Sequence, residues 1–113
     1  MKLTKKRALN LWAKRFGNAR YAVDFHGSLM CREAYGDEKY YIIDHGEKVF
    51  CGWDIHHILP SAHGGTDSES NLICTNIITN RCAGDRITFW IDDSQYQIRH
   101  IYGTGVHEII KLT

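Results

Sequence analysis

The sequence has no run of eighteen or more apolar residues, so none of its segments predicts a membrane-spanning helix. Residues 1–20 also lack the apolar core of a signal peptide. The four cysteines include no Cys-x-x-Cys pair, and the chain has no internal repeat and no low-complexity tract. We therefore expect a cytoplasmic protein without a membrane partner, whose cysteines stay reduced and mostly act as small buried side chains.

The overall composition is that of an ordinary globular protein. Of the 113 residues, 43% are hydrophobic and 24% are charged, which argues against both a disordered and a fibrous chain. A chain of this length can bury one hydrophobic core but has no room for two independent ones. We expect a single domain over residues 1–113, with one functional site.

Acidic residues are absent from residues 1–20, although the formal net charge of the whole chain is only +1. This segment carries seven bases, and the remaining 93 residues have a formal balance of −6. A basic arm on an acidic body is expected where the arm contacts a phosphate backbone, and a solvated helix face is the alternative. The bases expected to contact nucleic acid are Lys5, Lys6, Arg7, Lys14 and Arg15.

The apolar periodicity predicts one amphipathic helix followed by short strands. The helix is expected over residues 4–16, with Thr4 as its N-terminal cap and Gly17 at its end. Two strands around Gly27 predict a hairpin, and a second hairpin is expected near the C-terminus. The strand segments are residues 21–25, 29–34, 40–43, 86–91 and 96–101, with 106–112 as a weaker candidate.

Residues 52–85, GWDIHHILPSAHGGTDSESNLICTNIITNRCAGD, concentrate histidine, asparagine and turn residues. They predict a strand over 53–58, a polar loop over 61–70, a strand over 72–74 and a helix that Thr75 caps. This order is expected to bring His56 and His57 close to Asn80. Neighbouring residues of a regular strand point to opposite faces, so both histidines can serve one site only if the strand bends locally.

This segment resembles the ββα-metal motif of the HNH endonuclease family, as an H-N-N variant. The resemblance covers DIHHILP at residues 54–60, Gly64-Gly65, Asn71-Leu72 and, nine residues after Asn71, Asn80. The surrounding sequence is similar to stand-alone bacterial and phage HNH proteins. The resemblance implies an α+β fold, in which a ββα-metal (HNH/His-Me finger) core at residues 52–85 lies between a basic helical arm at 1–20 and a β-hairpin at 86–113.

The resemblance also assigns roles to four residues of the motif. His57 would be the general base that takes a proton from the attacking water, a task that suits imidazole near neutral pH. His56 and Asn80 would hold one divalent cation on the scissile phosphate. Asn71 would organise the loop by bonding its backbone, so that His57 is presented correctly. The products would carry 5′-phosphate and 3′-hydroxyl ends.

Two departures from the family pattern concern metals. Many relatives have aspartate at the position of His56, and imidazole in its place favours softer cations. The expected cofactor is Mg²⁺ or Mn²⁺, with Ni²⁺, Co²⁺ and Zn²⁺ as alternatives. Many relatives also bind a structural zinc through two Cys-x-x-Cys pairs, but Asn76 and Thr79 stand near the helix here, so no structural zinc is expected.

The expected substrate is DNA more than RNA, cut with little sequence preference because the motif itself does not read bases. A protein partner would then provide specificity, and a homodimer would allow both strands to be cut. One alternative is an inactive HNH-fold protein that binds nucleic acid or protein. Another is a structural zinc module of Cys31, Cys51, Cys74 and Cys82. The sequence leaves open whether the role is in a phage, in restriction, in defence or as an effector.

Overall fold

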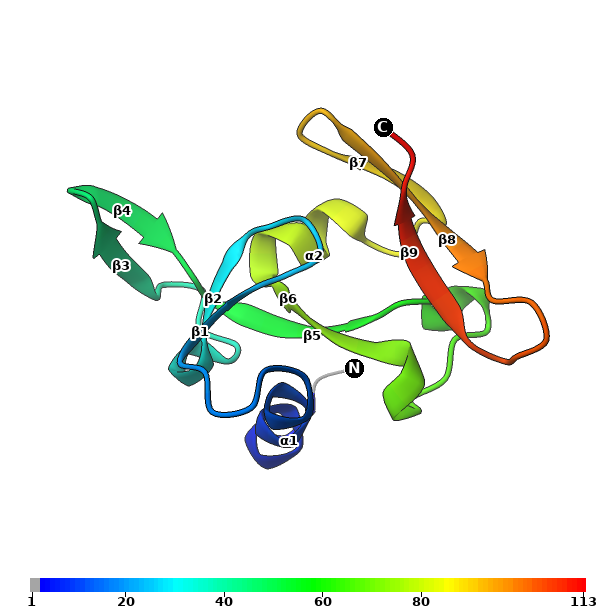
Figure 1. Ribbon diagram of the computed structural model, residues 1–113, viewed down its shortest axis with the longest axis horizontal. Helices are drawn as coiled ribbons and strands as arrows, with labels where there is room; N and C mark the ends of the chain where they lie inside the picture. Colours follow the sequence, from blue (N-terminus) through cyan, green and yellow to red (C-terminus); the bar gives the residue numbers. More distant parts are fainter. Residues whose placement is uncertain (1–2) are drawn as a thin grey trace. The chain divides into compact units, whose positions relative to one another are not determined.

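The computed structural model describes residues 3–113, and Lys2 of the basic arm lies outside this range (Figure 1). The chain divides into two compact units. Unit 1 contains the described residues up to Ile55 together with Cys74–Asn80, and unit 2 contains His56–Ile73 and Arg81–Thr113. Each unit is described by itself below.

Within residues 3–113 the chain forms two α-helices and nine strands. Neither of these helices is long and apolar enough to cross a membrane. The helices are α1 (Lys5–Phe16) and α2 (Ile77–Ala83). The strands are β1 (Tyr21–Val23), β2 (Leu29–Cys31), β3 (Tyr41–Asp44), β4 (Glu47–Phe50), β5 (Trp53–His57), β6 (Leu72–Asn76), β7 (Thr88–Ile91), β8 (Ser94–His100) and β9 (His107–Lys111).

The expected fold class, an α+β fold around a ββα-metal core, is wrong. The described strands form four small sheets, β1-β2, β3-β4, β5-β6 and β7-β8-β9, so the fold of residues 3–113 is β-rich with only two α-helices. Three of these sheets are antiparallel hairpins or meanders outside the motif. The prediction gave too much weight to residues 52–85, whereas tight turns elsewhere organise most of the chain into strands.

Helix α1 begins and ends where the sequence predicts. The Thr4 hydroxyl accepts a hydrogen bond from the Arg7 amide at 3.3 Å, which satisfies one of the free N–H groups of the first turn. Gly17 follows the last helical residue with a φ of 61°, a conformation that glycine adopts without steric cost. The buried face of the helix consists of Ala8, Leu11 and Trp12.

The core of unit 1 is built on aromatic side chains. Trp12 and Trp53 are fully buried, and their ring centroids lie 4.9 Å apart. Tyr35 packs against Trp53 at 5.0 Å, and its hydroxyl donates a hydrogen bond to the Leu3 carbonyl at 2.8 Å. The Trp12 indole donates to the Ala19 carbonyl at 2.9 Å. These contacts attach α1 to the start of β5, since large aromatic side chains bury much apolar area.

The turn between β1 and β2 is held by the buried carboxylate of Asp24. Its Oδ1 accepts hydrogen bonds from the amides of His26 and Ser28 at 3.0 and 2.9 Å. Its Oδ2 accepts a third bond from the amide of Asn76, 52 residues further along the chain, at 3.0 Å. One carboxylate therefore orders the hairpin turn and connects it to the end of β6.

The β3-β4 hairpin is a feature of unit 1 that the sequence predicted only in part. Its register pairs Tyr41 with Phe50, and it turns through His45 and Gly46 at φ angles of 50° and 80°. Two successive residues with positive φ are typical of a type I′ turn, which matches the twist of the flanking strands. Figure 1 shows this hairpin extending away from β1 and β2. Strand β4 was missed because its first residues are charged and exposed.

Asn76, and not Thr75, caps helix α2. The Asn76 side-chain oxygen accepts a hydrogen bond from the Ile78 amide at 2.9 Å, which is the contact of an N-terminal cap. The Asn76 side-chain nitrogen donates to the carbonyls of Leu29 and Phe50. The prediction of Thr75 as the cap is wrong because β6 continues to Asn76, so the helix begins one residue later.

Thr75 itself leads to a prediction about stability. Its side chain is fully buried, and no hydrogen-bond partner for its hydroxyl exists among residues 3–113. Because an unpaired buried hydroxyl is costly, Thr75→Val is expected to raise the free energy of unfolding by about 1 kcal/mol. Urea denaturation of both proteins measures the difference. A clear loss of stability in the variant would show that the hydroxyl is paired in solution.

Unit 2 contains the three-stranded sheet β7-β8-β9. Asp92, with a φ of 51°, lies in the β7-β8 turn, and the buried rings of Phe89 and Tyr96 stack with centroids 5.7 Å apart. Strand β9 pairs with β8 from Tyr96↔Lys111 to His100↔His107. The third strand, predicted from the weaker candidate segment at 106–112, is therefore present. Alternation along the strands leaves Trp90 exposed on the opposite face.

Candidate functional site

His57 and Asp67 form a close pair in unit 2. Strand β5 ends at His57, and its Nε2 lies 2.7 Å from Oδ1 of Asp67. The His57 side chain is only 15% exposed, whereas that of Asp67 is 54% exposed. The imidazole is therefore mostly covered, while the carboxylate remains in contact with solvent. Such a pair is suited to accept and hold a proton.

The loop that returns the chain from His57 to Asp67 requires close contact between backbones. A Cβ atom on Gly65 would lie 1.7 Å from the carbonyl oxygen of Leu59. The Gly65 amide donates a hydrogen bond to the Pro60 carbonyl at 3.0 Å. Only glycine fits such an approach without displacing the backbone. Gly65 thus allows the loop to fold back beside the end of β5.

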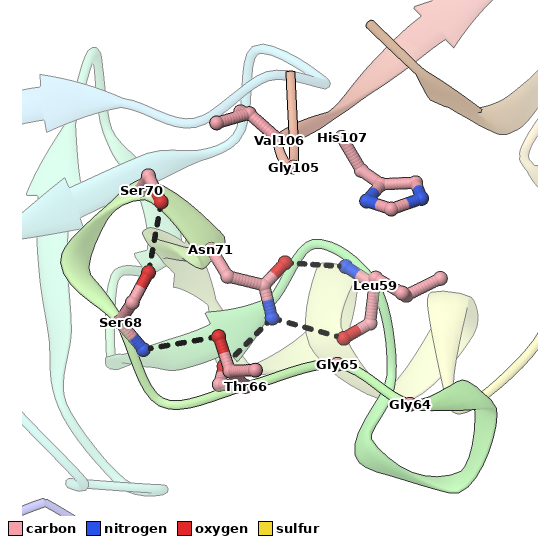
Figure 2. A pocket seen from close by; sticks show the side chains of 10 residues that line it. All are labelled: Leu59, Gly64, Gly65, Thr66, Ser68, Ser70, Asn71, Gly105, Val106 and His107. Carbon is pink, nitrogen blue, oxygen red and sulfur yellow. Dashed lines mark hydrogen bonds between the residues drawn. The ribbon is translucent and has the colours of Figure 1, made fainter. Parts of the chain in front are cut away.

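Asn71 holds this loop through its side-chain amide, as Figure 2 shows. Its Oδ1 accepts a hydrogen bond from the Leu59 amide at 2.9 Å, and its Nδ2 donates to the Leu59 carbonyl at 3.1 Å. The same Nδ2 donates to the Thr66 carbonyl at 2.8 Å. Contacts across the loop are the kind expected for Asn71 from the sequence, and its catalytic role stays a prediction. Leu59 follows His57 by two residues and Thr66 precedes Asp67, so one amide positions both members of the pair.

Because Asn71 makes three side-chain hydrogen bonds, replacing it by the similarly sized aspartate is expected to lower stability strongly. In Asn71→Asp, a carboxylate oxygen would replace the Nδ2 donor and face the carbonyls of Leu59 and Thr66. We expect the free energy of unfolding to fall by about 2 to 4 kcal/mol, because two donors are lost and like partial charges meet. Thermal or urea unfolding measures it, with the exposed Asn10→Asp as a matched control. Equal stability of the two variants would contradict this role.

The expected metal ligands, His56 and Asn80, belong to different units. His56 is buried at 6% exposure in β5 and is the first residue of unit 2. Asn80 is half-buried in α2 and is the last residue of unit 1. Their shared coordination of a cation stays a prediction. No group of three or more His, Cys, Asp or Glu side chains that could hold a metal occurs among residues 3–113.

The basic residues of the arm lie on the exposed surface of α1. All five that were expected to contact nucleic acid are exposed, while Ala8, Leu11 and Trp12 face the core of unit 1. The helix has no acidic residue in its first turn. Its outer face is therefore strongly positive. The five are Lys5, Lys6, Arg7, Lys14 and Arg15.

The cysteines behave as small apolar side chains. Cys31, Cys51 and Cys74 are buried, Cys82 is half-buried, and all four are free. Burial raises the pKa of the Cys74 thiol to about 12. Burial is also the main reason that the pKa of the Cys51 thiol is raised, and the nearby Cys31 thiol raises it further. Protonated thiols at neutral pH pack like small hydrophobes. The prediction that most cysteines are buried is confirmed, and the four-thiolate zinc module has no counterpart within residues 3–113.

Asp67 was not among the site residues that the sequence predicted. The loop at residues 61–70 contains only two acidic residues, Asp67 and Glu69, so the sequence limits the possible acidic partners of His57 from this loop to these two. The glycine pair Gly64-Gly65 suggested a chain reversal that would return one of them toward His57. Spacing alone did not distinguish the two, because the direction of each side chain depends on the loop conformation.

Comparison of the chain with models of known protein families, with curated proteins and with solved structures found no match.

Proposed function

We propose that this protein is a metal-dependent endonuclease of the HNH type that hydrolyses phosphodiester bonds in DNA. The observation that supports it best is the His57–Asp67 pair at 2.7 Å, located where the sequence motif has its general base. The proposal rests on the motif and on this pair. It does not depend on a ββα-metal fold.

The pair has the chemistry that a general base needs. In the tautomer with its hydrogen on Nε2, His57 donates that hydrogen to Asp67. The Nδ1 atom then carries the lone pair that accepts a proton from water. The carboxylate stabilises the imidazolium that forms and keeps the ring in one tautomer, as acidic partners of catalytic histidines do. Because the His57 ring is mostly covered, its orientation is restricted before substrate arrives.

The loop contributes positioning. Asn71 bonds the backbone on both sides of the pair, at Leu59 and Thr66, so that the ring and the carboxylate keep their separation. Restricting reactive groups to one geometry lowers the entropic cost of reaching the transition state. Asn71 is in this sense a positioning residue.

The motif also implies a divalent cation that binds substrate, and this part of the proposal rests on the motif alone. His56 and Asn80 would supply one imidazole nitrogen and one amide oxygen, and two protein ligands leave positions for water and phosphate oxygens, as Mg²⁺ and Mn²⁺ sites commonly do. When bound, such a cation polarises the phosphate and stabilises the leaving oxygen. The protein's own contribution to the reaction is then the proton transfer at His57.

The basic face of α1 would contact the DNA backbone. Lys and Arg side chains that neutralise phosphates release counterions, so binding should weaken steeply as salt increases. These contacts carry no sequence information, which fits an enzyme with little sequence preference. The proposed location of this enzyme is the cytoplasm. Specificity would come from a protein partner.

Cleavage of supercoiled plasmid by the 113-residue chain tests the proposal. The reactions contain EDTA or one of Mg²⁺, Mn²⁺, Ni²⁺ and Zn²⁺, at low and at moderate salt. We expect nicked product with at least one metal and none with EDTA. If the folded protein does not cut DNA with any of these metals but still shifts DNA in a gel, the enzymatic proposal is wrong. The protein would then be a nucleic-acid-binding protein.

A further inference from the structure

A cavity of about 80 Å³ lies within unit 2, between the loop that carries Asp67 and the turn that joins β8 to β9. Figure 2 shows the loop on one side and the turn on the other. On the same measure a single water needs roughly 10 to 15 Å³, so the cavity has room for a small polar ligand. The lining residues that matter most are Gly65, Ser68, Ser70, Asn71, Gly105 and His107.

The lining favours an anion. The side chains that line it include hydroxyls and an imidazole but, among the described residues, no carboxylate. Ser68 and Ser70 place their hydroxyl oxygens 2.8 Å apart. One of these hydroxyls donates to the other, which leaves the second hydrogen for a ligand. The Asn71 amide hydrogens already bond the carbonyls of Leu59 and Thr66, so the side-chain donors on this wall are the hydroxyls of Ser68, Ser70 and Thr66.

His107 provides a donor from the β9 side of the cavity. It is the register partner of His100 across the β8-β9 pair, and the two ring centroids lie 5.1 Å apart. The Nε2 of His100 contacts the Thr104 carbonyl, which orders the turn beside the cavity. Imidazole can donate to an oxyanion in its neutral or in its protonated form. Glu108, the nearest carboxylate along β9, is exposed and does not line the cavity.

We propose that this cavity binds a phosphate group. In the proposed nuclease, on which this part of the inference rests, it would hold a phosphodiester that neighbours the one being cut. Asp67, the partner of His57, stands in the chain between the lining residues Thr66 and Ser68. A phosphate held there would therefore lie beside the loop that positions the general base, and would align the strand with it.

Binding is tested without metal and without cleavage, by ¹H–¹⁵N NMR of the full chain in EDTA. Inorganic phosphate and a short DNA duplex are titrated separately into wild type, Ser70→Ala, His107→Gln and the control Ser94→Ala, at constant ionic strength. We expect saturable shifts of the Ser68, Ser70 and Gly105 amides in wild type and in the control. Each cavity variant should weaken phosphate binding about fivefold, the effect of one lost hydrogen bond.

The two ligands distinguish the sources of phosphate. Shifts at the cavity with DNA, with or without inorganic phosphate, support a backbone subsite. Shifts with inorganic phosphate alone overturn the nucleic-acid part, because the cavity then takes free phosphate. No shift with either ligand, or equal binding by all four proteins with unchanged spectra elsewhere, overturns the site. If the protein cuts DNA but its cavity amides do not shift, only this inference is wrong. If it binds phosphate in the cavity but never cuts DNA, only the proposed function is wrong.

Discussion

Replacing His57 by alanine is expected to lower the rate of metal-dependent DNA cleavage by roughly two to four orders of magnitude, the usual contribution of a general base. In the His57–Asp67 pair the imidazole is the proposed proton acceptor, with Asp67 as its hydrogen-bond partner at 2.7 Å. Binding of DNA should change little, because the basic face of α1 is untouched. Single-turnover nicking of supercoiled plasmid measures the rate, and a gel shift in EDTA measures binding.

Asp67→Asn and His63→Ala make this result specific. The asparagine keeps the size of Asp67 but removes its charge, so we expect a smaller loss of about 10- to 100-fold, as for other groups that orient a catalytic residue. His63 is an exposed histidine of the same loop and serves as the control, with no expected loss. If His57→Ala is folded and as active as His63→Ala, then His57 is not the base.

Replacing Asp24 by alanine is expected to lower the free energy of unfolding by about 3 to 5 kcal/mol. The Asp24 carboxylate is 7% exposed and accepts three backbone hydrogen bonds, from the amides of His26, Ser28 and Asn76. The bond to the Asn76 amide is buried, so its loss leaves a donor without water or protein partner. A loss of this size is a large part of the stability of a small protein.

Two variants separate this effect from a simple loss of charge. Asp24→Asn keeps one acceptor oxygen and is expected to lose less, about 1 to 2 kcal/mol. Asp93→Ala removes an exposed acid of the β7-β8 turn and should be neutral within about 0.5 kcal/mol. Urea denaturation followed by circular dichroism compares the three. Equal midpoints for Asp24→Ala and Asp93→Ala would show that the Asp24 bonds contribute no net stability.

Where contacts join residues a few positions apart, the sequence predicted the structure well. The cap of α1 is such a case, because Thr4 bonds an amide three residues away and Gly17 ends the helix at once. The hairpins of β1-β2 and β7-β8 also follow from turn residues next to alternating strands. Such local preferences depend on neighbouring residues alone, so composition and spacing are enough to read them.

The fold class and the partners of the site depended on contacts between distant residues. Asp24 bonds Asn76 across 52 positions, and at that junction α2 begins one residue later than the local capping preference of Thr75 indicated. The pairing of Asp67 with His57 depends on a loop that folds back only because Gly65 can touch Leu59. The sequence by itself determined which segments form helix and hairpins and which histidines draw attention. Only the tertiary structure decided which carboxylate reaches His57, since side-chain direction in a loop follows from backbone contacts that no local pattern encodes.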